Sequence, residues 1–319
     1  MTELEHLLRA VVVEPGSPGA WRAVADGLDR LGVPGRAELL RLHRLLLATC
    51  CAPEQHPERR GWHARLVELL AHGVRPCLPH RTVPLGGNVD LAFHLVPPGA
   101  FLMGSPPGEP GRRDDEARHR VTLTAARWLG TGPVTQAQGR AVMGHNPSRF
   151  PGDGHPVEGV SWHDGAAFCR KLGARLGRPC RLPTEAEWEH ACRAGTTTPY
   201  HCGDALSAGE ANCDGRRAAA GGGRGACRDG TTPVESFPPN AWGLFDLHGN
   251  VREWCSDWYG PCPTGDEADP EGPDGGPGRV LRGGSWCRGP GECRSASRGW
   301  LGPGDRSDDV GCRVVLGPD

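Results

Sequence analysis

Residues 237–254 read FPPNAWGLFDLHGNVREW, a stretch in which turn-forming Pro, Asn and Gly residues stand among large aromatic and aliphatic ones. The whole 319-residue chain has the same texture, because its 49 Gly and 31 Pro make up about a quarter of it, with no period-three repeat. Such a composition could indicate disorder, but the chain also has 10 Trp residues, and large aromatic residues are rare in disordered segments. We therefore expect an ordered fold with many loops and turns.

Charge, hydropathy and cysteine content narrow the classes of protein to consider. The net charge is −2, so neither a nucleic acid nor an anionic membrane is expected as a partner. The first residues lack a basic region followed by an apolar run, and no stretch of about 18 apolar residues occurs. We expect a cytoplasmic protein whose 14 Cys stay reduced. Most of them would fill the core, and a few could bind a metal or take part in redox chemistry.

The first 75 residues have the pattern of a small all-α module. Apolar residues recur there at helical spacing in four runs, and Pro/Gly-rich breaks such as residues 15–19 separate the runs. Residues 25–42 resemble the repeat-companion domain, a short bacterial N-terminal module that implies no activity of its own. We expect a helical module over residues 1–75 and a linker over residues 76–87.

In residues 88–319 the sequence pattern changes from helical spacing to short β-type runs. Short β-type runs such as 89–96 and 119–123 lie between Gly/Pro clusters. Two helices are expected to begin at capping boxes, which the residue types at Ser161–Asp164 and Thr184–Glu187 provide. Few helices, short strands and long loops together predict an α+β domain.

Several segments of this domain, in chain order, resemble the sulfatase-modifying factor family. Besides residues 237–254, they are VPPGAFLMGS (96–105), PVT (133–135), NPS (146–148), PVEGVSW (156–162), RLPTEAEWE (181–189), RGGSW (282–286) and GCR (311–313). The resemblance implies the fold of formylglycine-generating enzymes, a loop-rich variant of the C-type-lectin-like fold. Family members include oxidases and domains without known chemistry, so the fold alone does not give the function.

Formylglycine-generating enzymes oxidise a substrate Cys to an aldehyde with oxygen and copper(I), and the resemblance implies two active-site thiols that bind this metal. Soft thiolates select Cu(I). Cys287 and Cys293 lie in the corresponding segment, after Ser285, which matches a serine near the family's active site. The spacing departs from the family's pattern, because Cys287 follows Trp286 directly and Cys293 comes six residues later. A shift of one position in extended backbone turns a side chain to the opposite face, although a bend at residues 289–291 could compensate.

The alternative for this segment is structural. Cys287 would then fill a variable loop position, and Cys293 would pack beneath Arg294 as a core residue.

The resemblance also implies a calcium site. The carried-over ligands are the side chain of Asp246, the backbone carbonyls of Gly249 and Val251, and the carboxylate of Glu253. Oxygen ligands of this kind suit a hard cation. The alternative is that Glu253 and Arg252 form structural ion pairs.

A second calcium site of the family would use Asn212 and the carbonyl of Cys213, with its remaining ligands in residues 218–229, which do not align with the family. The family also includes iron-dependent sulfoxide synthases, whose histidine ligands follow a His-x3-His-x-Glu pattern, and this pattern is absent from the sequence. Residues 221–225 resemble a phosphate-binding loop in composition only, so we expect a flexible loop there.

The leading hypothesis is a formylglycine-generating-type oxidoreductase that oxidises a Cys in a sulfatase-like protein or peptide with oxygen and copper. The alternative is a noncatalytic binding module on the same fold. The two hypotheses differ in whether Cys287 and Cys293 face each other.

Overall fold

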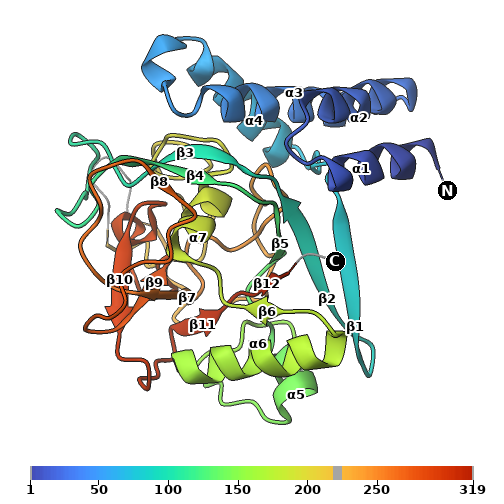
Figure 1. Cartoon of the computed structure of the whole chain (residues 1–319). Helices are drawn as coiled ribbons and strands as arrows, with labels where there is room; N and C mark the ends of the chain where they lie inside the picture. Colours follow the sequence, from blue (N-terminus) through green and yellow to red (C-terminus); the bar gives the residue numbers. More distant parts are fainter. Residues whose placement is uncertain (1, 218–224, 318–319) are drawn as a thin grey trace.

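The N-terminal part of the chain forms a layer of helices, as the apolar spacing predicts. In the computed structural model, which describes residues 2–217 and 225–317, this layer lies above the rest of the molecule (Figure 1). Its elements are α1 (Glu3–Val13), α2 (Pro18–Arg30), α3 (Pro34–Thr49), the 3₁₀ turn η1 (Pro53–Gln55) and α4 (Arg59–Ala71).

Local chemistry explains where these helices begin. Thr2 and Glu5 close a capping box at the start of α1, and the Ser17 side chain accepts a hydrogen bond at the start of α2. Pro occupies the first position of α2, where its missing N–H costs nothing. One face of α2 then buries Trp21 and Leu28 against the neighbouring helices.

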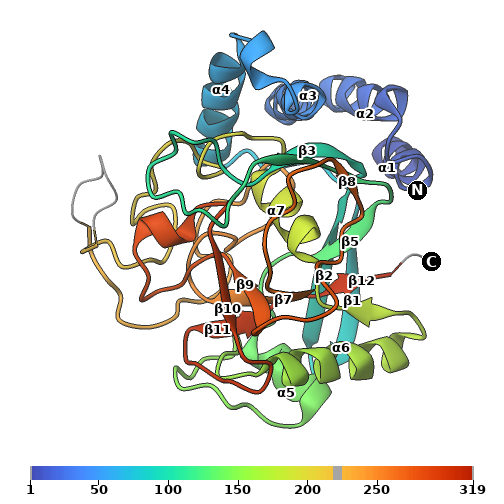
Figure 2. The ribbon, with the colours of Figure 1, turned by 60° about the vertical axis from the view of Figure 1, so that its left-hand side comes forward.

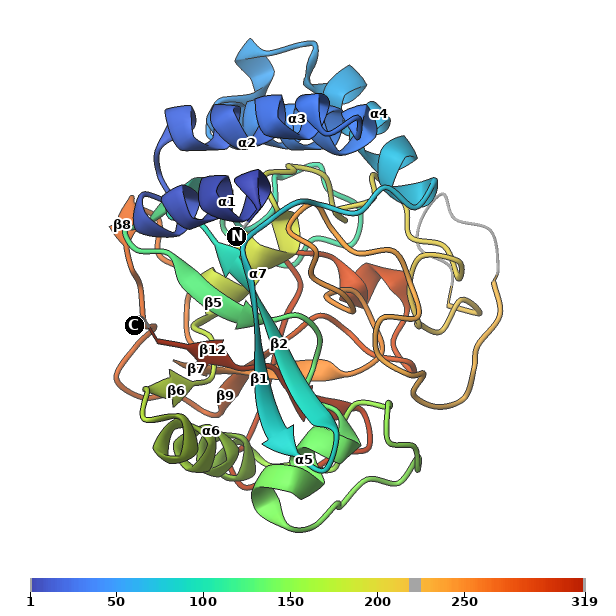
Figure 3. The same cartoon turned by 90° about the vertical axis from the view of Figure 1, so that its right-hand side faces the viewer.

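The remainder of the chain contains short strands in three sheets. The five-stranded sheet has the order β1 (His80–Gly86), β2 (Val89–Val96), β5 (Arg127–Gly130), β12 (Val315–Leu316) and β6 (Cys180–Arg181). The four-stranded sheet has the order β10 (Arg298–Leu301), β9 (Arg279–Arg282), β7 (Arg252–Trp258) and β11 (Val310–Cys312). The third sheet joins β3 (Gly99–Met103), β4 (His119–Leu123) and β8 (Glu267–Ala268). Figure 3 shows the β1–β2 hairpin running from below α1 toward α5.

Three helices complete the domain. Helices α5 (Gln136–Met143) and α6 (Trp162–Leu176) lie at the end opposite the helical layer, whereas α7 (Glu185–Arg193) runs between the sheets (Figure 2). Every residue of α7 is buried, including its charged ones. A helix buried all round must satisfy its charges inside the protein, and this requirement shapes the site described below.

The helical layer shares one hydrophobic core with the domain. The Nη2 of Arg59 donates to the carbonyl of Gly195 at 2.9 Å. The ring of His43 packs edge-on against Trp242, with 5.6 Å between the ring centroids. The segment expected as a linker, residues 76–87, contains β1, which pairs antiparallel with β2.

The sequence-based expectations for the main elements are confirmed. The capping boxes at Ser161–Asp164 and Thr184–Glu187 open α6 and α7. After α7, the described residues contain only one further helical element, the short 3₁₀ turn η2 (Pro290–Cys293). The fold is α+β, and no described helix is long and apolar enough to cross a bilayer. Most of the Gly-rich stretch 221–225 lies outside the described residues.

Candidate functional site

The segment 282–286 leaves strand β9 in a sharp turn. Gly283 and Gly284 have φ values of 97° and 67°, a backbone region that favours glycine. A Cβ atom on Gly284 would lie 2.4 Å from the Sγ of Cys293. The Gly284 backbone therefore packs directly on Cys293, and this close approach requires glycine.

Cys287 faces a buried acid. Its Sγ lies 3.4 Å from the Ser285 Oγ and 3.5 Å from the Asp309 Oδ2, and the Ser285 hydroxyl donates to Asp309 at 3.0 Å. Burial raises the pKa of Asp309, but two hydrogen bonds from Arg252, of 2.8 and 3.0 Å, help to hold this pKa well below its usual range. Burial raises the pKa of the Cys287 thiol, Ser285 lowers it, and the charge of Asp309 raises it again. The net direction is upward, so this environment disfavours the thiolate.

Cys293 points into the core. Its exposed fraction is 0%, and it forms a small cluster with Tyr200 and Cys213. The hydrogen bond to the Cys213 thiol, followed by burial, raises the pKa of Cys293 well above its usual range. Within the described chain, no hydrogen bond joins Cys293 to Cys287. The structure therefore gives the two thiols separate neighbours.

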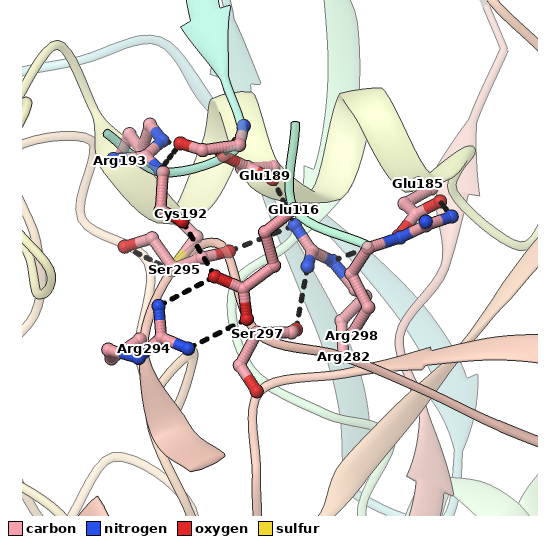
Figure 4. A network of polar contacts seen from close by, with 12 residues as sticks. Glu116, Glu185, Glu189, Cys192, Arg193, Arg282, Arg294, Ser295, Ser297 and Arg298 are labelled. Atoms are coloured by element: carbon pink, nitrogen blue, oxygen red, sulfur yellow. Dashed lines mark hydrogen bonds and ion pairs between the residues drawn. The ribbon is translucent and has the colours of Figure 1, made fainter. Parts of the chain in front are cut away.

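Arg294 fixes the segment that carries Cys293. Its guanidinium donates to both carboxylate oxygens of Glu116 at 2.7 and 2.8 Å (Figure 4). It also donates to Glu109 at 2.6 Å and to the carbonyls of Gly111 and Gly291. The side chains of Arg294 and both glutamates are at most 2% exposed. A buried cation bound to two buried carboxylates resists displacement, because any separation leaves a charge unpaired.

A second buried network connects the same segment to α7. Arg282 pairs with Glu189, and it donates to the carbonyls of Ser295 and Ser297 at 2.9 and 2.6 Å (Figure 4). Glu189 also pairs with Arg193 at 2.8 Å. These contacts satisfy the charges of the buried helix and hold residues 295–297 in place.

A cleft of about 270 Å³ opens beside Gly283 and Gly284. Its walls include four arginines and an exposed tryptophan, namely Arg113, Arg252, Arg288, Arg298 and Trp300. Among the described residues, neither Cys287 nor Cys293 lines this cleft. A larger cavity, of about 850 Å³, lies between α4 and the loop 197–204 and shares no lining residue with the cleft.

Of the two carboxylates expected to bind calcium, Glu253 is engaged by other side chains and Asp246 is not fully engaged. Both carboxylate oxygens of Glu253 accept hydrogen bonds from Arg313, the shortest of 2.7 Å, and one also accepts from Trp188 Nε1 at 2.7 Å. Glu253 and Arg313 have fully buried side chains. The Oδ1 of Asp246 is buried without a hydrogen bond, and burial raises the pKa of Asp246 to about 6. One carboxylate thus has an oxygen available, whereas the other is engaged by an arginine.

The second expected calcium site also has one ligand atom that is available and one that is already engaged. Asn212 has a buried Oδ1 without a hydrogen bond, while the carbonyl of Cys213 accepts from the Gly215 N–H at 3.0 Å. Some of the remaining expected ligands, in 218–224, lie outside the described residues. In the described part of the chain, no group of three or more His, Cys, Asp and Glu side chains could hold a metal ion. This absence does not bear on the expected sites, because the copper site would have only two thiols, and the first calcium site only two carboxylates besides its backbone carbonyls.

Comparison with known proteins identifies the family. The model described as "Sulfatase-modifying factor enzyme 1-like domain" matches residues 90–317. The chain belongs to the sulfatase-modifying factor family. It is 37% identical to the formylglycine-generating enzyme of Streptomyces coelicolor over 249 residues, which cover 72% of this chain and 69% of that enzyme. It is 36% identical to the mouse formylglycine-generating enzyme over 206 residues.

Other members of the family carry different descriptions. Serine/threonine-protein kinase pkn1 of Chlamydia caviae is 38% identical over 168 residues, or 51% of this chain. The matched regions span 24% of that kinase and 53% of the mouse enzyme. Among solved structures, Treponema denticola variable protein 1 (TM-score 0.66, 29% identity) and PvdO from Pseudomonas aeruginosa (TM-score 0.62, 27% identity) each match 75% of this chain and nearly all of their own. These likenesses confirm the formylglycine-generating-enzyme fold for this family member.

Proposed function

We propose that this chain is a binding module of the sulfatase-modifying factor family and does not oxidise cysteine with copper. The observation that carries the proposal is the position of Cys293, which is fully buried against Cys213 while Cys287 faces Ser285 and Asp309. A two-thiolate copper(I) site needs two sulfurs that can approach one metal ion. Here one sulfur would have to leave the core to do so.

The charge state of the thiols supports the same proposal. The thiolate, not the thiol, is the metal ligand. The pKa of Cys293 is raised by the hydrogen bond to Cys213 and by burial, and the pKa of Cys287 is raised by burial. Both environments favour the protonated thiol, so binding copper(I) would carry the added cost of ionising the buried Cys293 and the partly buried Cys287.

The cleft beside Gly283 and Gly284 is the binding surface that this proposal requires. It is concave and opens at Gly283 and Gly284, next to the segment in which the family resemblance implies the active-site thiols. Polar side chains line it, and Trp300 at its wall is 46% exposed. Relatives described as a formylglycine-generating enzyme and as a serine/threonine-protein kinase both match this chain. One fold can serve several functions, so the local residues must decide between them.

The second candidate function is the oxidase. The 37% identity to a formylglycine-generating enzyme favours it, and its substrate would be a cysteine in a sulfatase-like protein or peptide. It requires residues 288–293 to rearrange so that Cys293 turns toward Cys287. Arg294 opposes this movement through its buried ion pairs with Glu109 and Glu116.

A turnover assay separates the two candidates. The full chain is loaded with copper(I) and incubated in air with a cysteine-containing peptide that carries the sulfatase motif, and mass spectrometry monitors conversion of the thiol to the aldehyde. We expect no aldehyde above the level given by a Cys287→Ser and Cys293→Ser double variant. Aldehyde formation that the double substitution abolishes would establish the oxidase and refute the binding-module proposal.

A further inference from the structure

We infer that the cleft beside Gly283 and Gly284 binds an acidic peptide segment in extended conformation. The inference rests on the proposed function, because it names the ligand class of the binding module. The cleft is lined by Arg113, Arg252, Arg288 and Arg298, and Glu292 is its only acidic lining residue within the described chain. A carboxylate that enters such a cleft exchanges its water for guanidinium donors, which bind carboxylates in a bidentate manner.

Three of the arginines have donors to offer. Arg252 gives its Nε and Nη2 to Asp309, which leaves Nη1 without a hydrogen bond to any described residue. Arg288 is 37% exposed; its Nε faces the Asp309 Oδ2 at 3.6 Å and its Nη1 faces Glu292 at 3.3 Å, which leaves Nη2 without a hydrogen bond to any described residue. Arg113 is 52% exposed, and its one hydrogen bond to the described protein is a long contact of 3.3 Å to the carbonyl of Arg298. Arg298 is different, because Glu185 binds it at 2.6 and 2.7 Å and holds it in the wall.

Glu292 occupies the position that a ligand carboxylate would take. Its carboxylate lies 3.3 Å from Arg288 Nη1 and 3.9 Å from Arg113 Nη2, and the side chain is 32% exposed. These contacts are longer than the 2.7–2.9 Å typical of charge-assisted hydrogen bonds. Glu292 therefore screens the two arginines only loosely. A ligand carboxylate can displace it without breaking a tight ion pair.

The shape of the cleft favours a peptide over a small anion. The cleft runs along β10, the edge strand of its sheet, which lies at the outer left of the molecule in Figure 1. An extended peptide can lie along such an edge and form main-chain hydrogen bonds with it. Trp300 of β10 is exposed, and its ring centroid lies 6.1 Å from that of Tyr259, which gives an apolar surface next to the arginines. A volume of about 270 Å³ is below the roughly 300–1,000 Å³ of small-molecule sites and suits one or two side chains of a peptide.

Isothermal titration calorimetry of the full chain tests this inference. The probe is an N-acetylated, C-amidated octapeptide of alternating Glu and Thr, and the control peptide has Gln at each Glu position. We expect the Glu peptide to bind at low salt, and to bind more weakly as salt screens the exposed charges. Arg113→Gln and Arg288→Gln should each weaken binding about tenfold, or about 1.4 kcal/mol. This is near the low end for a hydrogen bond to a charged group, because both arginines are partly exposed. Arg41→Gln is the matched control, because Arg41 is 45% exposed and also pairs with acids, on the helical layer.

A gain of affinity provides an independent check that misfolding cannot imitate. Glu292→Gln removes the competing carboxylate and should tighten binding several-fold, the range expected for a partly exposed ion pair of up to about 1 kcal/mol. The inference is overturned if the Gln peptide binds as well as the Glu peptide, or if the Arg113 and Arg288 variants bind like wild type. Displacement of the peptide by an equal concentration of inorganic phosphate would identify a small-anion site and also overturn it. Failure of the peptide to bind leaves the proposed function standing as long as no aldehyde forms, whereas aldehyde formation refutes the proposed function itself.

Discussion

Replacing Arg294 by Met should destabilise the domain and release Cys293. The substitution keeps an unbranched apolar chain but leaves Glu109 and Glu116 without their cation, and both carboxylates are at most 2% exposed. Breaking a buried ion pair by removing one partner costs about 3–5 kcal/mol. Domains of about 150–250 residues lose roughly 2–4 °C in Tm per kcal/mol. This chain is longer, so the lower factor applies, and the expected loss is about 6–10 °C.

The loss of Tm caused by Arg294→Met should increase with pH. Burial raises the pKa of Glu109 already in the native protein, against the effect of Arg294. Without Arg294, the folded-state pKa of Glu109 should rise further above its unfolded value, so the folded state binds more protons than the unfolded state. Stability then falls as pH rises, and the Tm deficit should be larger at about pH 8 than at about pH 5.

Differential scanning calorimetry at the two pH values measures the deficit, and iodoacetamide labelling followed by mass spectrometry reports the exposure of Cys293. Arg41→Met is the matched control, because its partners Asp26 and Asp29 are 43–49% exposed and such a pair contributes at most about 1 kcal/mol. If Arg294→Met melts within about 2 °C of wild type at both pH values, Arg294 does not hold this segment.

Three further predictions follow from buried contacts. Glu253→Gln should lower Tm by the same amount in calcium and in chelator, because Arg313 engages the carboxylate; a larger loss in calcium would support the metal site. Asp257→Asn should raise Tm at about pH 8 and have little effect at about pH 4, because burial raises the pKa of Asp257 to about 7 and a carboxyl with a raised folded pKa loses stability as pH rises; calorimetry that finds an equal effect at both pH values would contradict this. Deleting residues 1–79 should yield an insoluble or molten product by near-ultraviolet circular dichroism, because it exposes Trp242 and the shared core; a folded, soluble product would show that the helical layer is dispensable.

Local features of the fold could be predicted from the sequence because local chemistry determines them. The capping residues at Ser161–Asp164 and Thr184–Glu187 satisfy the first N–H groups of a helix wherever it lies. Likewise, the stretch 237–254 led to the family that residues 90–317 confirm. Such signals depend on neighbours in sequence and need no knowledge of tertiary contacts.

The arrangement of the candidate site could not be predicted, because its contacts join distant positions. The chain does bend after Gly289, in the short turn η2, but the bend does not compensate for the shifted spacing, because Cys293 packs inward against Cys213, a residue far away in sequence. The arginine cleft collects side chains from the loop at Arg113 and from strands β7 and β10. Arg252 lies within the stretch 237–254, and a structural ion pair was one of the two alternatives for it, but only the fold shows that its partner is Asp309.

Competitive copper(I) titration against a chromogenic chelator tests the central claim most directly. The other cysteines of the chain can bind copper(I), so the decisive quantity is the difference between wild type and the single variants Cys287→Ser and Cys293→Ser. Cys262→Ser is the control, since Cys262 is partly exposed like Cys287 and burial raises the pKa of its thiol to about 11. The separate surroundings of Cys287 and Cys293 predict that neither site variant changes the tightest binding step by more than the control does. The loss of one tightly bound copper(I) in both site variants, but not in the control, would contradict the proposed binding-module function.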